Sequence, residues 1–184
     1  MIKWLLRRQI AAFERTWNYD ATYMRDLVDA DSRAAMAFGK VMSLSAYHKD
    51  VPLAAYYAAK IIATIAEDCG PCTQLVVDMA ERAGVDAHTL HSIVAGDVEN
   101  MPDDAALAAG FADASLRHAT EADDMRAEIV RRWGQRALVS LTFALVAARI
   151  FPTAKYSLGH GRACMRVTVG GESRPVLREV ERAA

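Results

Sequence analysis

The chain has 184 residues, of which 53% are hydrophobic, and its 22 basic and 23 acidic residues leave a net charge of −1 at pH 7. This length is sufficient for one domain with a hydrophobic core, and a balanced charge gives no broad attraction for nucleic acid or an anionic membrane surface. Three cysteines do not make the disulfide framework of a small secreted protein. We therefore expect a cytoplasmic protein with neither a nucleic acid nor a membrane as its partner.

Residues 1–50 are expected to form a helical segment that packs on the rest of the chain. Hydrophobic residues recur every three or four positions from Ile2 to Trp17, which predicts an amphipathic helix. Asp20 is a candidate N-cap for a second helix, which we expect to extend to Leu44.

Residues 51–151 are expected to form a helical core. Pro52 begins a helix, Leu53 to Ala66, which is apolar nearly all round and therefore predicted to be buried. The helices expected after it are Pro71 to Gly84, Asp86 to Gly96, Asp103 to His118, Glu121 to Trp133 and Arg136 to Ile150. We expect Pro152 to stop the last of these, because proline disrupts a helix interior. The apolar stretch Leu138 to Phe151 is then too short to span a membrane.

Residues 152–184 are expected to form a C-terminal tail of different character. Polar and apolar residues alternate from Cys164 to Val169 before Gly170 and Gly171, which predicts one short strand. A single strand needs a partner, and another subunit could supply it. The fold class expected for the whole chain is all-α, with one short C-terminal strand.

The motif richest in chemistry is Glu67-Asp68-Cys69-Gly70-Pro71-Cys72. Two cysteines three positions apart can close into a disulfide and open again. Proline is favoured at the first position of a helix, so the pair lies where one apolar helix ends and the next begins. The positive end of the helix dipole favours a thiolate, which is the nucleophilic form of cysteine.

In this chain an alanine-rich helix runs into Cys-x-x-Cys at the head of the next helix, and Ala83-Gly84 and further helices follow. This arrangement resembles the alkylhydroperoxidase D-like proteins of the carboxymuconolactone decarboxylase family. The resemblance covers roughly residues 54–151. It implies an all-helical fold that assembles into dimers, trimers or hexamers. It also implies reduction of an organic hydroperoxide or hydrogen peroxide, in which Cys72 attacks the peroxide and Cys69 resolves the product. A dithiol protein would then reduce the disulfide, and no cofactor or metal is expected.

The chain departs from that family at two positions. The family has a histidine four residues after the second cysteine, where this chain has Val76, and a glutamate twelve residues before the first, where it has Tyr57. Both members of the family's proton relay are therefore replaced. Glu67 is the candidate replacement base, although a carboxylate beside a thiol also raises the pKa of that thiol.

Several alternatives remain open at this point. The same fold could be a catalytically silent module that senses oxidation, or a decarboxylase-type lyase. Cys69, Cys72, His88 and His91 could form a zinc site, although the histidine spacing is shorter than usual. A thioredoxin fold would require a strand before the motif, where this chain has helical character. The roles of His160 and Cys164 are left open.

Overall fold

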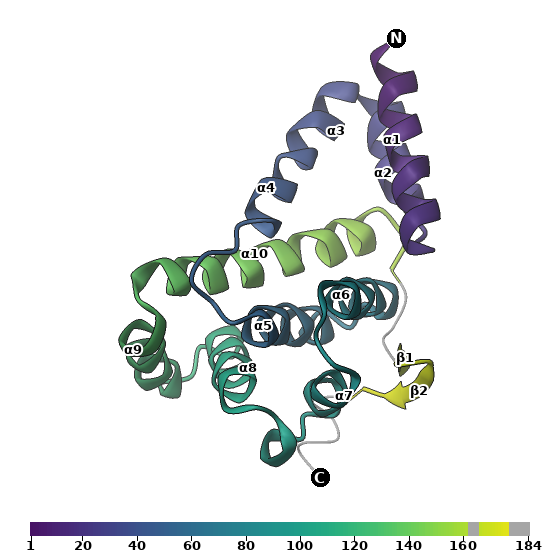
Figure 1. The fold of residues 1–184 in the computed structure, drawn as a ribbon. Coiled ribbons are helices and arrows are strands. Elements are labelled where there is room, and N and C mark those ends of the chain that lie inside the picture. The colour runs from purple at the N-terminus through teal and green to yellow at the C-terminus, as the bar shows by residue number, and fades with distance from the viewer. Residues whose placement is uncertain (162–165, 177–184) are drawn as a thin grey trace.

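The computed structural model describes residues 1–161 and 166–176 and shows an all-α fold with one small two-stranded sheet (Figure 1). The helices of the N-terminal segment are α1 (Ile2–Trp17), α2 (Thr22–Ala30), α3 (Ser32–Gly39) and α4 (Val41–Ser45). The remaining elements are α5 (Leu53–Ala66), α6 (Gly70–Ala83), α7 (Ala87–Ala95), the 3₁₀ turn η1 (Val98–Asn100), α8 (Asp103–Leu116), α9 (Glu121–Trp133), α10 (Gln135–Ser157), β1 (Arg166–Val169) and β2 (Glu172–Pro175).

The N-terminal segment contains more helices than the sequence predicted. The first helix has the predicted bounds, but the single helix expected from Asp20 to Leu44 is wrong, because the chain forms α2, α3 and α4 instead. Asp31 causes the first break. Its backbone is extended, and its side chain accepts a hydrogen bond from the Arg33 amide, so it caps α3 rather than continuing α2. Short polar side chains at such positions satisfy the free amides of a helix start.

Helix α5 lies at the centre of the core. It packs against α6, α7, α8 and α10, and its buried side chains include Ala55, Ala59, Ile61 and Ile62. Alanines are also buried on the facing helix α8, and small side chains allow two helices to approach closely. The prediction that α5 is buried is therefore confirmed, and the helix provides a rigid base for the cysteine motif that follows it.

Helix α10 does not stop at Pro152, so that prediction was wrong. The helix continues to Ser157, with Pro152 buried inside it. An internal proline removes one backbone hydrogen bond at a cost of about 3 kcal/mol. Contacts beyond it offset this cost, because Lys155 is buried and the Tyr156 hydroxyl donates a hydrogen bond to the Asp68 carbonyl.

The length argument against a membrane span falls with that correction. By length and composition, the 23-residue helix α10 is long and apolar enough to cross a membrane. An 18-residue stretch of it has a mean hydropathy of 1.7. Half of that stretch is buried inside the protein, where α10 packs on α4, α5 and α9. Core helices commonly pass the same test, so this feature is weak evidence for a span.

The strand predicted in the tail is present, but its partner comes from the same chain. Strand β1 pairs antiparallel with β2, and Val169 stands opposite Glu172 across the Gly170-Gly171 turn. Both glycines have positive φ, as a two-residue hairpin turn requires. Val167 and Val169 are buried in the core, and Thr168 exchanges two hydrogen bonds with the side chain of Gln74 on α6. The strand therefore needs no partner from another subunit, which was the source that the sequence left open. Cys164 lies outside the described residues.

Candidate functional site

The cysteine motif forms the turn between α5 and α6. Asp68 has a left-handed backbone (φ 50°), which reverses the chain so that Cys69 can cap α6 and Cys72 falls in its first turn. Cys69 and Cys72 are joined by a disulfide. The structure thus confirms the predicted position of the pair at a helix start and shows its oxidised state.

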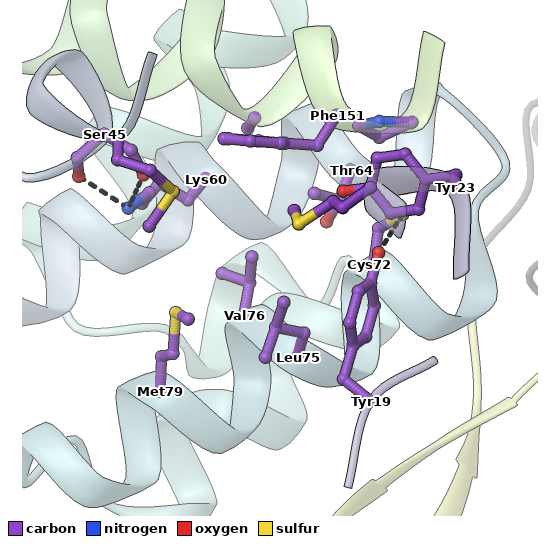
Figure 2. A pocket seen from close by; sticks show the side chains of 14 residues that line it. Tyr19, Tyr23, Ser45, Lys60, Thr64, Cys72, Leu75, Val76, Met79 and Phe151 are labelled. Carbon is purple, nitrogen blue, oxygen red and sulfur yellow. Dashed lines mark hydrogen bonds between the residues drawn. The ribbon is translucent and has the colours of Figure 1, made fainter. Parts of the chain in front are cut away.

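The two sulfurs differ in their access to a cavity. A cavity of about 60 Å³ lies between α5, α6, α10 and the N-terminal segment, and Cys72 lines it (Figure 2). Cys69 does not line it and has no exposed surface, whereas Cys72 is 4% exposed. The cavity wall is mainly apolar and includes Leu75, Val76 and Phe151. A small molecule in this cavity would meet Cys72, not Cys69.

Two tyrosines connect the N-terminal segment to Cys72. The Tyr19 hydroxyl lies 3.8 Å from Cys72 Sγ. A disulfide sulfur carries no hydrogen, so Tyr19 must be the donor. The Tyr23 hydroxyl in turn donates to Tyr19, a bond that lowers the pKa of Tyr19, but burial dominates and raises that pKa to about 12. Tyr19 therefore keeps its proton at neutral pH, and its hydroxyl can donate a hydrogen bond to the Cys72 sulfur.

Lys155 fixes the Tyr19 ring from behind. This lysine is 1% exposed, and its ammonium lies 4.4 Å from the centre of the Tyr19 ring. It also donates a hydrogen bond to the Asp20 carbonyl. A buried cation over an aromatic face is stabilising, so the loop between α1 and α2 is held against α10 with Tyr19 directed at Cys72.

The opposite end of the cavity is formed by a buried lysine. Lys60, on α5, is 6% exposed, and its ammonium donates to the Ser45 carbonyl (2.9 Å) and hydroxyl (3.0 Å). It also lies 4.9 Å from the centre of the Tyr56 ring. Figure 2 shows Lys60 beside Ser45 at one end and Cys72 beside Tyr19 at the other. Burial lowers the pKa of Lys60 to about 8.

The lowered pKa of Lys60 predicts a pH-dependent stability. Between about pH 8 and the ordinary lysine pKa of about 10.4, the unfolded chain holds a proton that the folded chain has lost, so stability rises with pH. The oxidised protein should gain about 1–2 kcal/mol of unfolding free energy from pH 8 to 9.5. Urea unfolding at each pH tests this, with Lys60→Met compared with Lys40→Met, which changes an exposed lysine between α3 and α4. If Lys60→Met shows the same gain in unfolding free energy between about pH 8 and 9.5, Lys60 is not the source of the pH dependence.

Glu67, the predicted base, is bound to two side chains of α10. Its carboxylate forms an ion pair with Arg149 and accepts a hydrogen bond from the Thr153 hydroxyl at 3.2 Å. Glu67 is not among the residues that line the cavity. Together with the bond from Tyr156 to the Asp68 carbonyl, this ion pair ties the turn before Cys69 to α10. In this arrangement Glu67 positions the turn.

Replacement of Glu67 separates a positioning role from a base role. The resemblance implies peroxide turnover; because the Glu67 carboxylate contacts α10, we expect Glu67→Gln to lower any such turnover less than about threefold and stability by less than about 1 kcal/mol. Loss of a general base typically costs at least about 100-fold. Arg149→Met is the matched variant, since it frees the same carboxylate. A drop of 100-fold in Glu67→Gln alone would establish Glu67 as the base.

The two positions at which the chain departs from the resembled family lie in different places. Val76 lines the cavity, so an apolar side chain stands where the resemblance places a histidine. Tyr57 is outside the cavity lining, with its ring against Tyr56. The Gln74 side chain, on the same helix as Cys72, bonds to Asp78 and Thr168.

The residues of the zinc alternative do not meet. Cys69 and Cys72 are bonded to each other, and His91 Nε2 lies 3.2 Å from the Val169 carbonyl of the hairpin. Within residues 1–161 and 166–176 no three potential ligand side chains converge. His160 lies 2.7 Å from an Asp26 carboxylate oxygen on α2 and does not line the cavity.

Neither Tyr19 nor Lys60 was among the residues predicted for the site. Tyr19 lies in the loop before α2, far from the motif in the chain, and no local pattern marks it. Lys60 had a signal, because a single lysine inside the apolar helix Leu53–Ala66 is a charge in a buried position.

A scan against protein-family models, a search of curated proteins and a search of solved structures found no match to this chain.

Proposed function

We propose that this chain is a thiol-dependent, peroxide-reducing protein that resembles the alkylhydroperoxidases, with Cys72 as the attacking thiol and Cys69 as the resolving one. The observation that carries the proposal is the placement of Cys72 in a cavity whose only nearby hydroxyl donor to sulfur among the described residues is Tyr19. The helical fold and the Cys69–Cys72 disulfide are consistent with that assignment.

The chemistry begins from the reduced pair. The Cys72 thiolate lies in the first turn of α6, where the helix dipole favours negative charge. It attacks the outer oxygen of the hydroperoxide and the O–O bond breaks, which leaves a Cys72 sulfenic acid and an alkoxide that takes a proton from water to become the alcohol. The Cys69 thiol then attacks the Cys72 sulfur and expels water, which regenerates the disulfide seen here.

A dithiol must close the cycle. One of its thiolates attacks the disulfide to give a mixed disulfide, and its second thiol displaces this bond, which leaves two protein thiols and an oxidised reductant. Cys72 is the accessible sulfur for this attack, because Cys69 is fully buried. A dithiol protein as the physiological reductant, a cytoplasmic location and assembly into a homo-oligomer remain parts of the proposal.

The test follows the disulfide itself. Reduced protein treated with one equivalent of cumene hydroperoxide should lose two hydrogens, and a peptide map should place the new bond between Cys69 and Cys72. Cumyl alcohol should appear in equal amount. Folded protein whose thiols remain reduced after this treatment would overturn the proposal.

A second candidate is an oxidation sensor of the same fold. It is favoured by the contact between Cys72 and Tyr19, which couples the redox state of the pair to the N-terminal segment, and by Val76 in place of a relay histidine. A sensor would react once with cumene hydroperoxide and then turn over slowly in excess dithiol. Sustained turnover distinguishes the enzyme from the sensor.

A further inference from the structure

Lys60 presents a buried charge that the thiol chemistry does not use. Its partners within residues 1–161 and 166–176 are neutral, namely the Ser45 carbonyl and hydroxyl, the Tyr56 hydroxyl at 3.5 Å, and the rings of Tyr56 and Tyr57. No carboxylate forms an ion pair with Lys60 in this described part of the chain. A buried ammonium without a counter-ion is costly, and lysine is seldom buried unless it is paired.

Lys60 lies at the end of the cavity that reaches Cys72, with its ammonium turned toward Ser45 (Figure 2). Lys60 and Ser45 line it together with apolar side chains from α6 and α10. Although burial lowers the pKa of Lys60 to about 8, the charged form still predominates at pH 7. An anion that displaced the longest of the Lys60 hydrogen bonds, the 3.5 Å contact to the Tyr56 hydroxyl, would therefore form a charge-assisted hydrogen bond in surroundings of low polarity.

A second hollow adjoins this cavity. It has a volume of about 210 Å³, lies among α1, α2, α3 and α4, and has no charged side chain in its lining. Met24, Met42 and Phe151 line both spaces, so these three side chains form the wall between them. Methionine side chains are flexible and adapt to apolar ligands of irregular shape.

We propose that Lys60 binds the carboxylate of an aliphatic acid, whose apolar chain fills the cavity toward Cys72 and the hollow behind Met24 and Met42. The anionic head supplies a counter-ion for Lys60, and the walls supply an apolar environment for the chain. Under the proposed function, on which this extension rests, the preferred substrates are hydroperoxides that also carry a carboxylate.

Binding can be measured without any thiol chemistry. The oxidised full-length protein is titrated with octanoate and, separately, with octan-1-ol, which has the same chain length and no charge. We expect octanoate to bind at least about tenfold more tightly than octanol to the wild type, as a buried ion pair would require. Lys60→Met should lose this preference, and Lys40→Met should retain it.

The location of the ligand is tested by methyl NMR of the methionines. Octanoate should shift the ε-methyl signals of Met24 and Met42, and leave that of Met125, which packs against Gly110, unchanged. This readout uses the wild type, so it holds even if Lys60→Met fails to fold. Equal affinity for octanoate and octanol, no binding of either, or shifts at Met125 but not at Met24 and Met42 would each overturn the inference.

The outcome is separable from that of the proposed function. If cumene hydroperoxide is reduced but octanoate does not bind, the head-group site is wrong while the peroxidase chemistry stands. If octanoate binds as described but the thiols do not react with any hydroperoxide, the peroxidase chemistry is wrong while the anion site stands.

Discussion

The reduced Cys69→Ser variant should consume one equivalent of cumene hydroperoxide and then stop. Its Cys72 thiolate can attack the peroxide, but no partner thiol remains to resolve the sulfenic acid. Cys72→Ser should consume none, and its turnover should fall by at least about 1,000-fold, as is usual when a nucleophile is removed. The measurement is trapping of the sulfenic acid with dimedone, followed by peptide mass mapping.

The two variants are matched controls for each other. Both remove one thiol from the same disulfide, so a general loss of stability affects them alike. They differ in the thiol that remains: Cys69→Ser keeps the thiol that lines the cavity, and Cys72→Ser does not. A dimedone adduct on Cys69 in the Cys72→Ser variant, with no adduct on Cys72 in Cys69→Ser, would reverse the assigned roles.

Removal of the Tyr19 hydroxyl should have the second largest effect on the rate of peroxide reduction. In the reduced protein this hydroxyl can donate to the Cys72 thiolate, and a hydrogen bond to a charged group contributes about 1.5–3 kcal/mol. Without it, Tyr19→Phe should raise the Cys72 pKa by about one unit and lower the rate of peroxide reduction at pH 7 about tenfold. The pKa is measured by the pH dependence of iodoacetamide alkylation.

The sign of this effect provides an internal check. A raised thiol pKa moves the rising limb of the rate profile to higher pH, so the defect of Tyr19→Phe should shrink as pH increases. Tyr23→Phe is the matched control, because it removes the same atom one hydrogen bond further from sulfur. An unchanged alkylation profile in Tyr19→Phe would show that this hydroxyl does not stabilise the thiolate.

The sequence predicted the elements whose causes are local. A short helix was expected from Asp86 to Gly96, and the Asp86 side chain accepts a hydrogen bond from the Thr89 amide at the start of α7. The cysteine pair was expected at a helix start because Pro71 marks one. In each case the side chain that determines the structure lies within one helical turn of the element.

The predictions that were wrong depend on contacts between distant segments. Pro152 should end a helix by local rules, yet contacts of Lys155 and Tyr156 with segments far away in the chain keep α10 helical to Ser157. The sequence predicted only one strand in the tail, because the short strand β2, its partner, was not recognised. Local periodicity carries no information about either contact.

The same limit applies to the site. Cys69 and Cys72 were found from their spacing, but Tyr19 reaches Cys72 across 53 residues of sequence, and Lys60 meets Ser45 from a different helix. Glu67 was selected because it is adjacent to the motif in sequence, whereas in the structure it is paired with Arg149, 82 positions away. Adjacency along the chain identified the turn but not the direction of its side chains.

The most direct test of the peroxidase proposal is the initial rate of cumyl alcohol formation from cumene hydroperoxide with excess dihydrolipoamide as the dithiol, for wild type and Cys72→Ser side by side. We predict many turnovers per wild-type chain and, for the variant, a rate equal to that of the dithiol alone. If wild type also proceeds no faster than the dithiol alone, although it is folded and reduced, this protein does not reduce hydroperoxides catalytically.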